Sequence, residues 1–202
     1  MIFAHVLVIA SVLISLVGSF AYVVDTIKGK SKPNRISWAM WASAPLVATI
    51  IALYSHADIW TTTRTFMAGF VPLTILIASF ISSKSYWKLT FFDFICGALS
   101  VLALIIWLLA GSPEIAILFA VAGDAFALIP TLAKAWKYPE TETGITFVAG
   151  LTASVLVLPL TPIWNIENSA FQIYLLVANT LLIGFIYKKY FLRIFTAIKN
   201  KV

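Results

Sequence analysis

The stretch DAFALIPTLAKAWKYPETETGITF, residues 124–147, decides the fold. It begins with Asp124 inside a long apolar run, and Pro130 follows six residues later. A charge in an apolar helix is costly, and a proline there removes a backbone hydrogen bond. A basic and polar segment comes next, after which the chain becomes apolar again. The stretch therefore predicts two membrane helices joined by a short basic loop, with a costly acid in the first helix.

The composition extends this interpretation to the whole chain. Of the 202 residues, 61% are hydrophobic and 11% are charged, and the mean hydropathy is +0.99. Soluble domains have about 25% charged residues, so this chain is too apolar to hide its surface in water. The apolar runs are long and unbroken, whereas a membrane barrel alternates apolar and polar residues. We therefore expect an all-α integral membrane protein that forms one compact helical bundle in the lipid bilayer.

Seven apolar runs predict seven transmembrane helices. Each run is long enough to cross a hydrocarbon core of about 30 Å. No basic residue precedes the first run, whose first lysine is Lys28, so we retain this run as a helix and not as a signal peptide. The predicted spans are roughly 2–27, 36–55, 65–83, 89–110, 113–136, 144–163 and 169–190.

The positive charges predict the orientation of these spans. Of the 14 Lys and Arg residues, 13 follow spans one, three, five and seven, and only Arg64 follows span two. The positive-inside rule then places the N-terminus outside and the C-terminus in the cytoplasm. Topology explains the net charge of +6, so we expect no nucleic-acid partner. The expected location is the plasma (inner) membrane of a prokaryote.

The chain also contains a weak internal repeat with an offset of 105 residues. GSFAYVVDTIKGKSKPNRISW, residues 18–38, aligns with the region that begins at Gly123, and FMAGFVPLT at 66–74 aligns with FQIYLLVAN at 171–179. Residues 1–83 and 113–202 are therefore predicted to form two three-helix bundles in the same orientation, and residues 84–112 a linker helix. The paired positions are Gly18 and Gly123, Ser19 and Asp124, Asp25 and Pro130, Thr26 and Thr131, and Thr74 and Asn179.

This layout of three helices, a linker helix and three more resembles the SWEET sugar transporters and the wider PQ-loop superfamily. The most specific match is the Pro130-Thr131 pair at the end of span five, for which the first copy has Asp25-Thr26. The resemblance implies transport of a small polar solute by alternating access, with these four residues and Pro45 as hinge or gate positions. SWEET proteins also carry an asparagine in the third helix of each bundle. Asn179 matches it, whereas Thr74 departs from it and weakens the inference of a sugar.

Polar residues near the middle of the spans are the candidate substrate contacts. Asp124, Thr74 and Asn179 fall at the centres of their spans, and Ser19 lies somewhat closer to the inner end. Gln172 is seven residues before Asn179 and so shares its helix face. Intramembrane polar residues mark substrate pathways, although hydrogen bonds between helices are the alternative for each of them.

Aromatic residues form a second group of candidate contacts. Trp38, Trp41 and Pro45 fall on one face of span two, and Tyr22 could join them as a wall for a ring-shaped substrate. The alternative is the belt of aromatic residues that many membrane proteins place at the lipid interface.

Several functions remain open at this point. The first is a transporter for a sugar or another small polar solute. The second resembles the nicotinamide-riboside transporters, and the third a proton-coupled amino-acid exporter in which Asp124 exchanges the proton. A receptor or scaffold that does not transport is the alternative of another class. We expect no enzyme and no cofactor or metal, because His5, His56 and Cys96 form no ligand cluster. Association into a homo-oligomer is left open.

Overall fold

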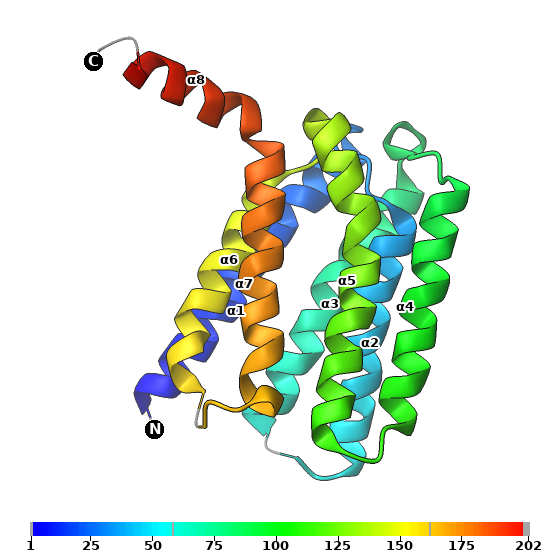
Figure 1. Ribbon diagram of the computed structural model, residues 1–202, viewed down its shortest axis with the longest axis vertical. Coiled ribbons are helices and arrows are strands. Elements are labelled where there is room, and N and C mark those ends of the chain that lie inside the picture. The colour runs from blue at the N-terminus through cyan, green and yellow to red at the C-terminus, as the bar shows by residue number, and fades with distance from the viewer. Residues whose placement is uncertain (1, 58, 162, 200–202) are drawn as a thin grey trace.

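The protein is an all-helical bundle in the part of the chain that the structure describes, residues 2–57, 59–161 and 163–199 of a computed structural model (Figure 1). The helices run up and down in sequence order, joined by short connections. The α-helices are α1 (Ile2–Ile27), α2 (Arg35–Tyr54), α3 (Ile59–Ile81), α4 (Phe91–Leu109), α5 (Pro113–Lys137), α6 (Gly144–Val157), α7 (Ile166–Ile186) and α8 (Lys188–Lys199). Three short 3-10 turns accompany them: η1 (Ser83–Ser85), η2 (Pro139–Thr141) and η3 (Leu158–Leu160).

Within the described residues, six helices are long and apolar enough to cross a membrane, namely α1 to α5 and α7. The sixth predicted span is shorter than expected, with an apolar helix over Gly144–Leu160. Helix α6 ends at Val157, and Pro159 lies in the 3-10 turn that follows. Proline lacks the N–H that the next turn of an α-helix requires, which explains the early end. The predicted seven apolar helices are present, but only six of them have full spanning length.

Two other boundaries differ from the predictions. Helix α3 begins at Ile59 and not near residue 65, because the threonine-rich segment before Phe66 lowers the hydropathy without breaking the helix. The last predicted span ends at Ile186, and a separate helix, α8, follows it.

The helices pack in a closed ring. Helix α3 packs against both α1 and α2, and α7 packs against both α5 and α6. Helices α1 to α3 thus form one triplet and α5 to α7 a second. The two triplets meet where α1 packs against α6 and where α2 packs against α5. Following these contacts gives the circular order α1, α3, α2, α5, α7, α6. Helix α4 packs against α5 and α2 and lies at the edge of the bundle in Figure 1.

One buried core joins all six helices of this ring. Its side chains come from every ring helix, so the triplets share a single interior. The core includes Tyr22 of α1, Trp38 of α2, Ile75 of α3, Leu128 of α5, Phe147 of α6 and Leu182 of α7.

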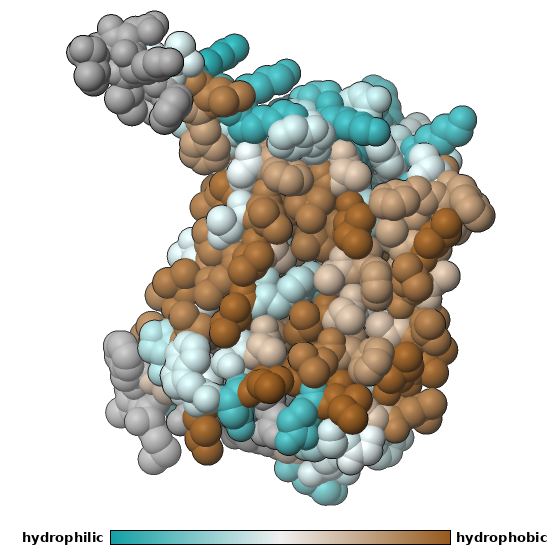
Figure 2. All heavy atoms as spheres, in the orientation of Figure 1, coloured by the Kyte–Doolittle hydropathy of each residue, from teal (hydrophilic) through white to brown (hydrophobic). Residues whose placement is uncertain are grey.

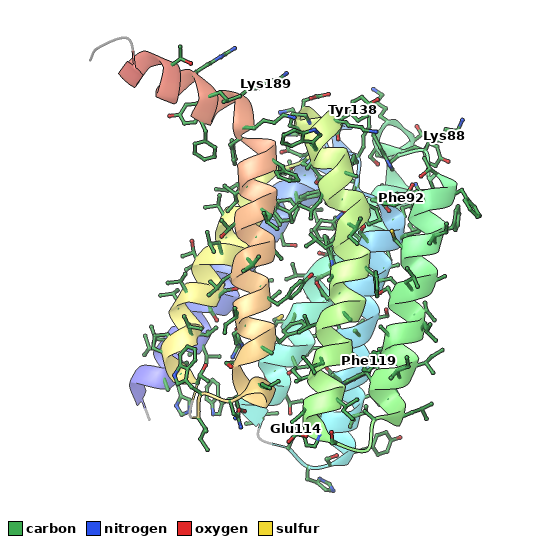
Figure 3. The ribbon with its side chains drawn as sticks, in the orientation of Figure 1. Lys88, Phe92, Glu114, Phe119, Tyr138 and Lys189 are labelled. Carbon is green, nitrogen blue, oxygen red and sulfur yellow. The ribbon has the colours of Figure 1, made fainter. Side chains whose placement is uncertain are left out.

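The outer surface carries an apolar belt between two polar ends (Figure 2). Large hydrophobic side chains are exposed along it, such as Val17 and Phe20, each 70% exposed. Apolar surface of this extent matches the hydrocarbon core of a bilayer. Lys88, Tyr138 and Lys189 lie at one end of the bundle and Glu114 lies at the opposite end (Figure 3). We call the first of these the basic end; it comprises segments 28–34, 82–90 and 138–143 and the start of α8.

Candidate functional site

The carboxylate of Asp124 lies halfway along α5 and faces α7. Its Oδ2 accepts a hydrogen bond of 2.6 Å from the Tyr174 hydroxyl of α7. The Trp41 indole of α2 lies near the same carboxylate, but its buried Nε1 makes no hydrogen bond with the described residues. Three helices from both triplets thus meet at one acid. The acid and its neighbours offer a hydrogen-bond acceptor and donors inside the bundle, which is what a polar solute requires.

Trp41 is also part of an aromatic cluster toward the basic end. The Trp38 ring lies 5.0 Å from the Trp41 ring and 4.9 Å from the Tyr22 ring, measured between centroids. Phe147 of α6 lies 6.4 Å from Trp38. Tyr22 and Trp38 are buried, so they are not an interfacial belt. The structure therefore brings together the three aromatic residues that the sequence singled out, and adds Phe147.

The remaining polar candidates do not converge on Asp124. Ser19 and Thr74 contact each other between α1 and α3 at 3.3 Å, and Thr74 also donates to the Val71 carbonyl of its own helix. Asn179 donates to the Leu175 carbonyl and lies against Gly150 of α6. The structure thus places these three residues in contacts between or within helices.

Gln172 differs from the other polar candidates. Its Oε1 is buried and makes no hydrogen bond with the described residues. A buried amide oxygen without a partner is costly, so this atom is available to a ligand or a water molecule.

A buried ion pair within the second triplet is bonded to the first triplet at the basic end. The Lys134 Nζ of α5 lies 2.7 Å from Glu142 Oε1, and the two side chains are 1% and 0% exposed. The hydroxyl of Tyr22 donates to Glu142 Oε2 at 2.5 Å. Lys134 also donates to the backbone carbonyl of Lys32, in the loop between α1 and α2. A buried pair holds only when each charge keeps its partners, so this network fixes the two triplets against each other.

A second set of bonds joins the two loops directly. Thr143 donates to Asp25 Oδ2 at 3.0 Å, and its hydroxyl also contacts the Ser31 hydroxyl. The Lys32 amide donates to the Thr141 carbonyl at 3.0 Å. The other oxygen of this carboxylate, Asp25 Oδ1, lies 3.9 Å from Lys30 Nζ. Loops 28–34 and 138–143 are thereby bonded across the seam between the triplets, and this end of the ring is closed.

Among the predicted hinge residues, Thr26 lies next to the last residue of α1, whereas Pro130, Thr131 and Pro45 lie farther inside their helices. Thr26 and Thr131, which are paired by the internal repeat, are both fully buried, and neither hydroxyl has a hydrogen-bond partner among the described residues. Pro130 is buried in α5, which continues helically past it to Lys137. Pro45 lies inside α2, where its carbonyl accepts a bond from Thr49. Each proline removes one backbone bond, which makes its helix easier to bend at that level.

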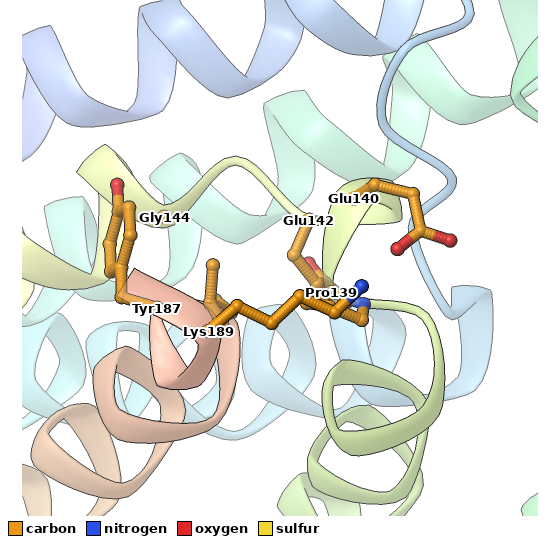
Figure 4. A pocket seen from close by; sticks show the side chains of 7 residues that line it. Pro139, Glu140, Glu142, Gly144, Tyr187 and Lys189 are labelled. Atoms are coloured by element: carbon orange, nitrogen blue, oxygen red, sulfur yellow. The ribbon is translucent and has the colours of Figure 1, made fainter. Parts of the chain in front are cut away.

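A surface hollow of about 350 Å³ opens at the basic end between η2 and the end of α7 (Figure 4). Glu140, Glu142, Tyr187 and Lys189 line it. The hollow contains neither Asp124 nor Tyr174, and it reaches the buried network only through Glu142. We therefore regard it as the outer rim of the closed end.

Several residues of the site escaped the sequence analysis. Glu142 and Lys134 were not predicted as site residues, because nothing local distinguishes a charge that folds inward from a solvated one. Tyr174 was not among the predicted contacts, although it lies only three residues from Phe171 in span seven. The one available signal was the density of acids in PETET, residues 139–143, beside a basic segment. Among the described residues, no group of three His, Cys, Asp or Glu side chains could hold a metal.

No protein-family model matches the chain, and neither a curated protein nor a solved structure gives a significant match. The function is therefore inferred from the geometry.

Proposed function

We propose that the chain is an integral membrane transporter for a small polar solute, and that its two helix triplets move against each other to give alternating access. One observation carries the proposal. A mid-depth carboxylate, Asp124, lies in a ring of six helices whose basic end is closed by a network between the triplets. An intramembrane acid is retained where it serves a pathway or a partner.

The like contacts in the two triplets support this mechanism. The first and third helices pack together in each triplet, as do the second and third, and the first helix of each triplet packs against the second helix of the other. Such an arrangement has an approximate two-fold relation about an axis along the bundle, which parallel repeats in transporters share. It supports the interpretation of residues 1–83 and 113–202 as two bundles with a linker helix. It also supports the resemblance to the SWEET and PQ-loop transporters.

The network at the basic end defines one of the two conformations that alternating access requires. With Glu142 bonded to Lys134 and Tyr22, and Thr143 bonded to Asp25, solute cannot pass between loops 28–34 and 138–143. Under the proposed orientation this end is cytoplasmic, so the structure corresponds to a state closed toward the cytoplasm. Opening requires these bonds to separate while the triplets tilt, and Pro130 and Pro45 give α5 and α2 a point at which each helix can bend.

The test is a solute screen on the purified chain, followed by uptake into proteoliposomes. Sugars, nucleosides, vitamins and amino acids are added to the detergent-solubilised protein, and the melting temperature is recorded. A solute that binds the folded state in large excess over its Kd should raise the stability by about 3 kcal/mol. The same solute should be taken up by proteoliposomes that contain the protein.

Asp124→Asn is the informative variant and Glu114→Gln is its matched control. Glu114 is an exposed acid in the first turn of the same helix. Transport is supported if Asp124→Asn abolishes both the shift and the uptake while Glu114→Gln keeps them. Binding without uptake in the parent protein would favour a receptor. An absence of any shift, with Asp124→Asn at least as stable as the parent, would favour a scaffold.

A further inference from the structure

Helix α8 has two chemically distinct faces. Apolar residues recur in it with helical spacing at Tyr190, Phe191, Ile194, Phe195 and Ile198, and the opposite side of the helical wheel carries Lys189, Arg193 and Thr196. Its four basic residues are not balanced by any acidic residue between positions 188 and 199. This pattern differs from that of α1 to α7, which are apolar on most sides, and it is typical of helices that lie flat on a membrane.

The helix has little support from the rest of the chain. Its main packing contact is with the end of α7, and it projects away from the bundle in Figure 1. Tyr190 and Leu192 are 61% and 65% exposed. An isolated helix shorter than about 12–15 residues is marginal in water, so α8 requires a surface that covers its apolar face.

Lys188 fixes the direction in which α8 leaves the bundle. Its Nζ donates to the backbone carbonyl of Trp136 at the end of α5 and lies 4.0 Å above the centre of the Trp136 ring. The junction between α7 and α8 is thereby held at the basic end, where the apolar belt stops. The loops of the basic end and the end of α5 carry further exposed lysines, including Lys28, Lys84, Lys88 and Lys137.

We infer that α8 is a binding surface for anionic lipid headgroups, lying in the membrane interface with its apolar face toward the acyl chains. Each Lys or Arg near an anionic bilayer surface contributes to attraction, and four in one helix give a substantial sum. The partner is a lipid surface because Lys189 and Arg193 lie opposite the apolar face, as an interface between water and lipid requires. The inference depends on insertion of the apolar helices into a bilayer and not on transport.

The experiment places a fluorescent probe on each face of α8 in the full-length protein. Cys96 is the only cysteine and is buried, and Cys96→Ala removes it. Phe191→Cys then labels the apolar face and Thr196→Cys the polar face, each with a nitrobenzoxadiazole probe. The protein is placed in nanodiscs of phosphatidylcholine alone or with phosphatidylglycerol, and quenching by aqueous iodide is measured. In anionic nanodiscs the probe at 191 should be quenched at least ~3-fold less than the probe at 196.

The charge is tested with Lys189→Ser and Arg193→Ser together in the Phe191→Cys background. Protection of the probe at 191 should fall in this variant, in neutral nanodiscs and at high salt, because each change removes the electrostatic attraction. Equal quenching at 191 and 196 in anionic nanodiscs would overturn the inference. So would protection at 191 that ignores lipid charge and the double substitution, since that result indicates a contact with protein or with any apolar surface. Solute uptake measured on the same preparations reports separately on the proposed transport.

Discussion

Asp124 has one well-defined partner, the hydroxyl of Tyr174, and that partner determines what the acid can do. A carboxylate that accepts a bond at 2.6 Å from a neighbouring helix is held toward the middle of the bundle. A solute that binds there can exchange hydrogen bonds with both groups. The Trp41 indole on the opposite triplet gives this position an aromatic side as well.

Tyr174→Phe is therefore expected to weaken the site without unfolding the protein. The change removes only the hydroxyl, and hydrogen bonds between membrane helices contribute about 0.6 kcal/mol on average. We expect a fall in stability of about 1 kcal/mol or less, together with a clear loss of solute binding under the proposed function. Thermal unfolding and the solute-induced shift measure the two effects. Tyr138→Phe, which alters an exposed tyrosine, is the control. Unchanged solute binding in Tyr174→Phe would remove this hydroxyl from the site.

Substitutions in the Lys134–Glu142 pair should change the free energy of unfolding more than Tyr174→Phe does, because both charges are buried. Lys134→Met alone leaves Glu142 without its cation and should lower the free energy of unfolding by about 3–5 kcal/mol. Lys134→Met combined with Glu142→Gln removes both charges and should recover most of that loss. Chemical or thermal unfolding of the three proteins measures the coupling. Additive losses in the double variant would show that the two side chains do not depend on each other.

Sequence analysis singled out Asp124 and overlooked Glu142 for one physical reason. A charge inside an apolar run stands out without any knowledge of the fold, since its cost is local. Glu142 lies in a polar segment where a solvated acid would be ordinary, and its burial depends on Tyr22 and Lys134, which are distant in sequence. Similarly, Asn179 was matched to a family position, but the packing against Gly150 depends on how α6 and α7 approach each other.

At the scale of elements, the length of each apolar run predicted most helices. The prediction failed where a proline ends a helix early and where a helix has one polar face. Helix α1 has the predicted bounds, and α4 and α5 are within two residues of them. Helix α6 is short because of Pro159, and α8 was missed because its mixed faces lower its hydropathy. A search for apolar runs cannot find an interfacial helix, whereas its periodicity can.

The contact between α1 and α6 depends on Gly18. A Cβ at this position would lie 2.5 Å from the Ala149 Cβ of α6, too close for any side chain. Gly18→Val should separate the helices and lower stability by about 1–3 kcal/mol, as overpacking does in a filled interior. Gly184→Ala is the matched control, because nothing lies within 4 Å of its Cβ. That substitution should be neutral or stabilise α7 by up to about 1 kcal/mol. Thermal unfolding compares the two, and equal effects would contradict the close crossing.

For the whole molecule, the sequence repeat predicted two bundles that face each other, but not which helices would meet. An offset of 105 residues relates positions in the chain and is silent about packing. The ring order depends on close approaches such as that of Gly18 to Ala149. The closed end depends on bonds from Thr143 to Asp25 of α1 and from Lys134 to the Lys32 carbonyl. Thr26 and Thr131 are the exception. The repeat pairs them, and both are fully buried with no hydrogen-bond partner for the hydroxyl among the described residues.

Alternating access makes a prediction about the two loops together. The hydroxyl oxygens of Ser31 and Thr143 lie 2.5 Å apart across the seam, so Ser31→Cys with Thr143→Cys, in a Cys96→Ala background, should place two thiols within reach of a disulfide. Oxidation would tie loop 28–34 to loop 138–143. Because the basic end must open in every transport cycle, uptake into proteoliposomes should then stop, while solute binding to the closed state persists.

Reduction of the same preparation with dithiothreitol should restore uptake, which separates a locked protein from a misfolded one. Each single-cysteine variant, treated with the same oxidant, should transport normally. Full uptake with the disulfide formed would mean that the loops need not separate, and the basic end would then not be a gate. Loss of binding together with uptake would mean instead that the solute enters from the basic end, which reverses the direction of access but keeps the two loops as the moving parts.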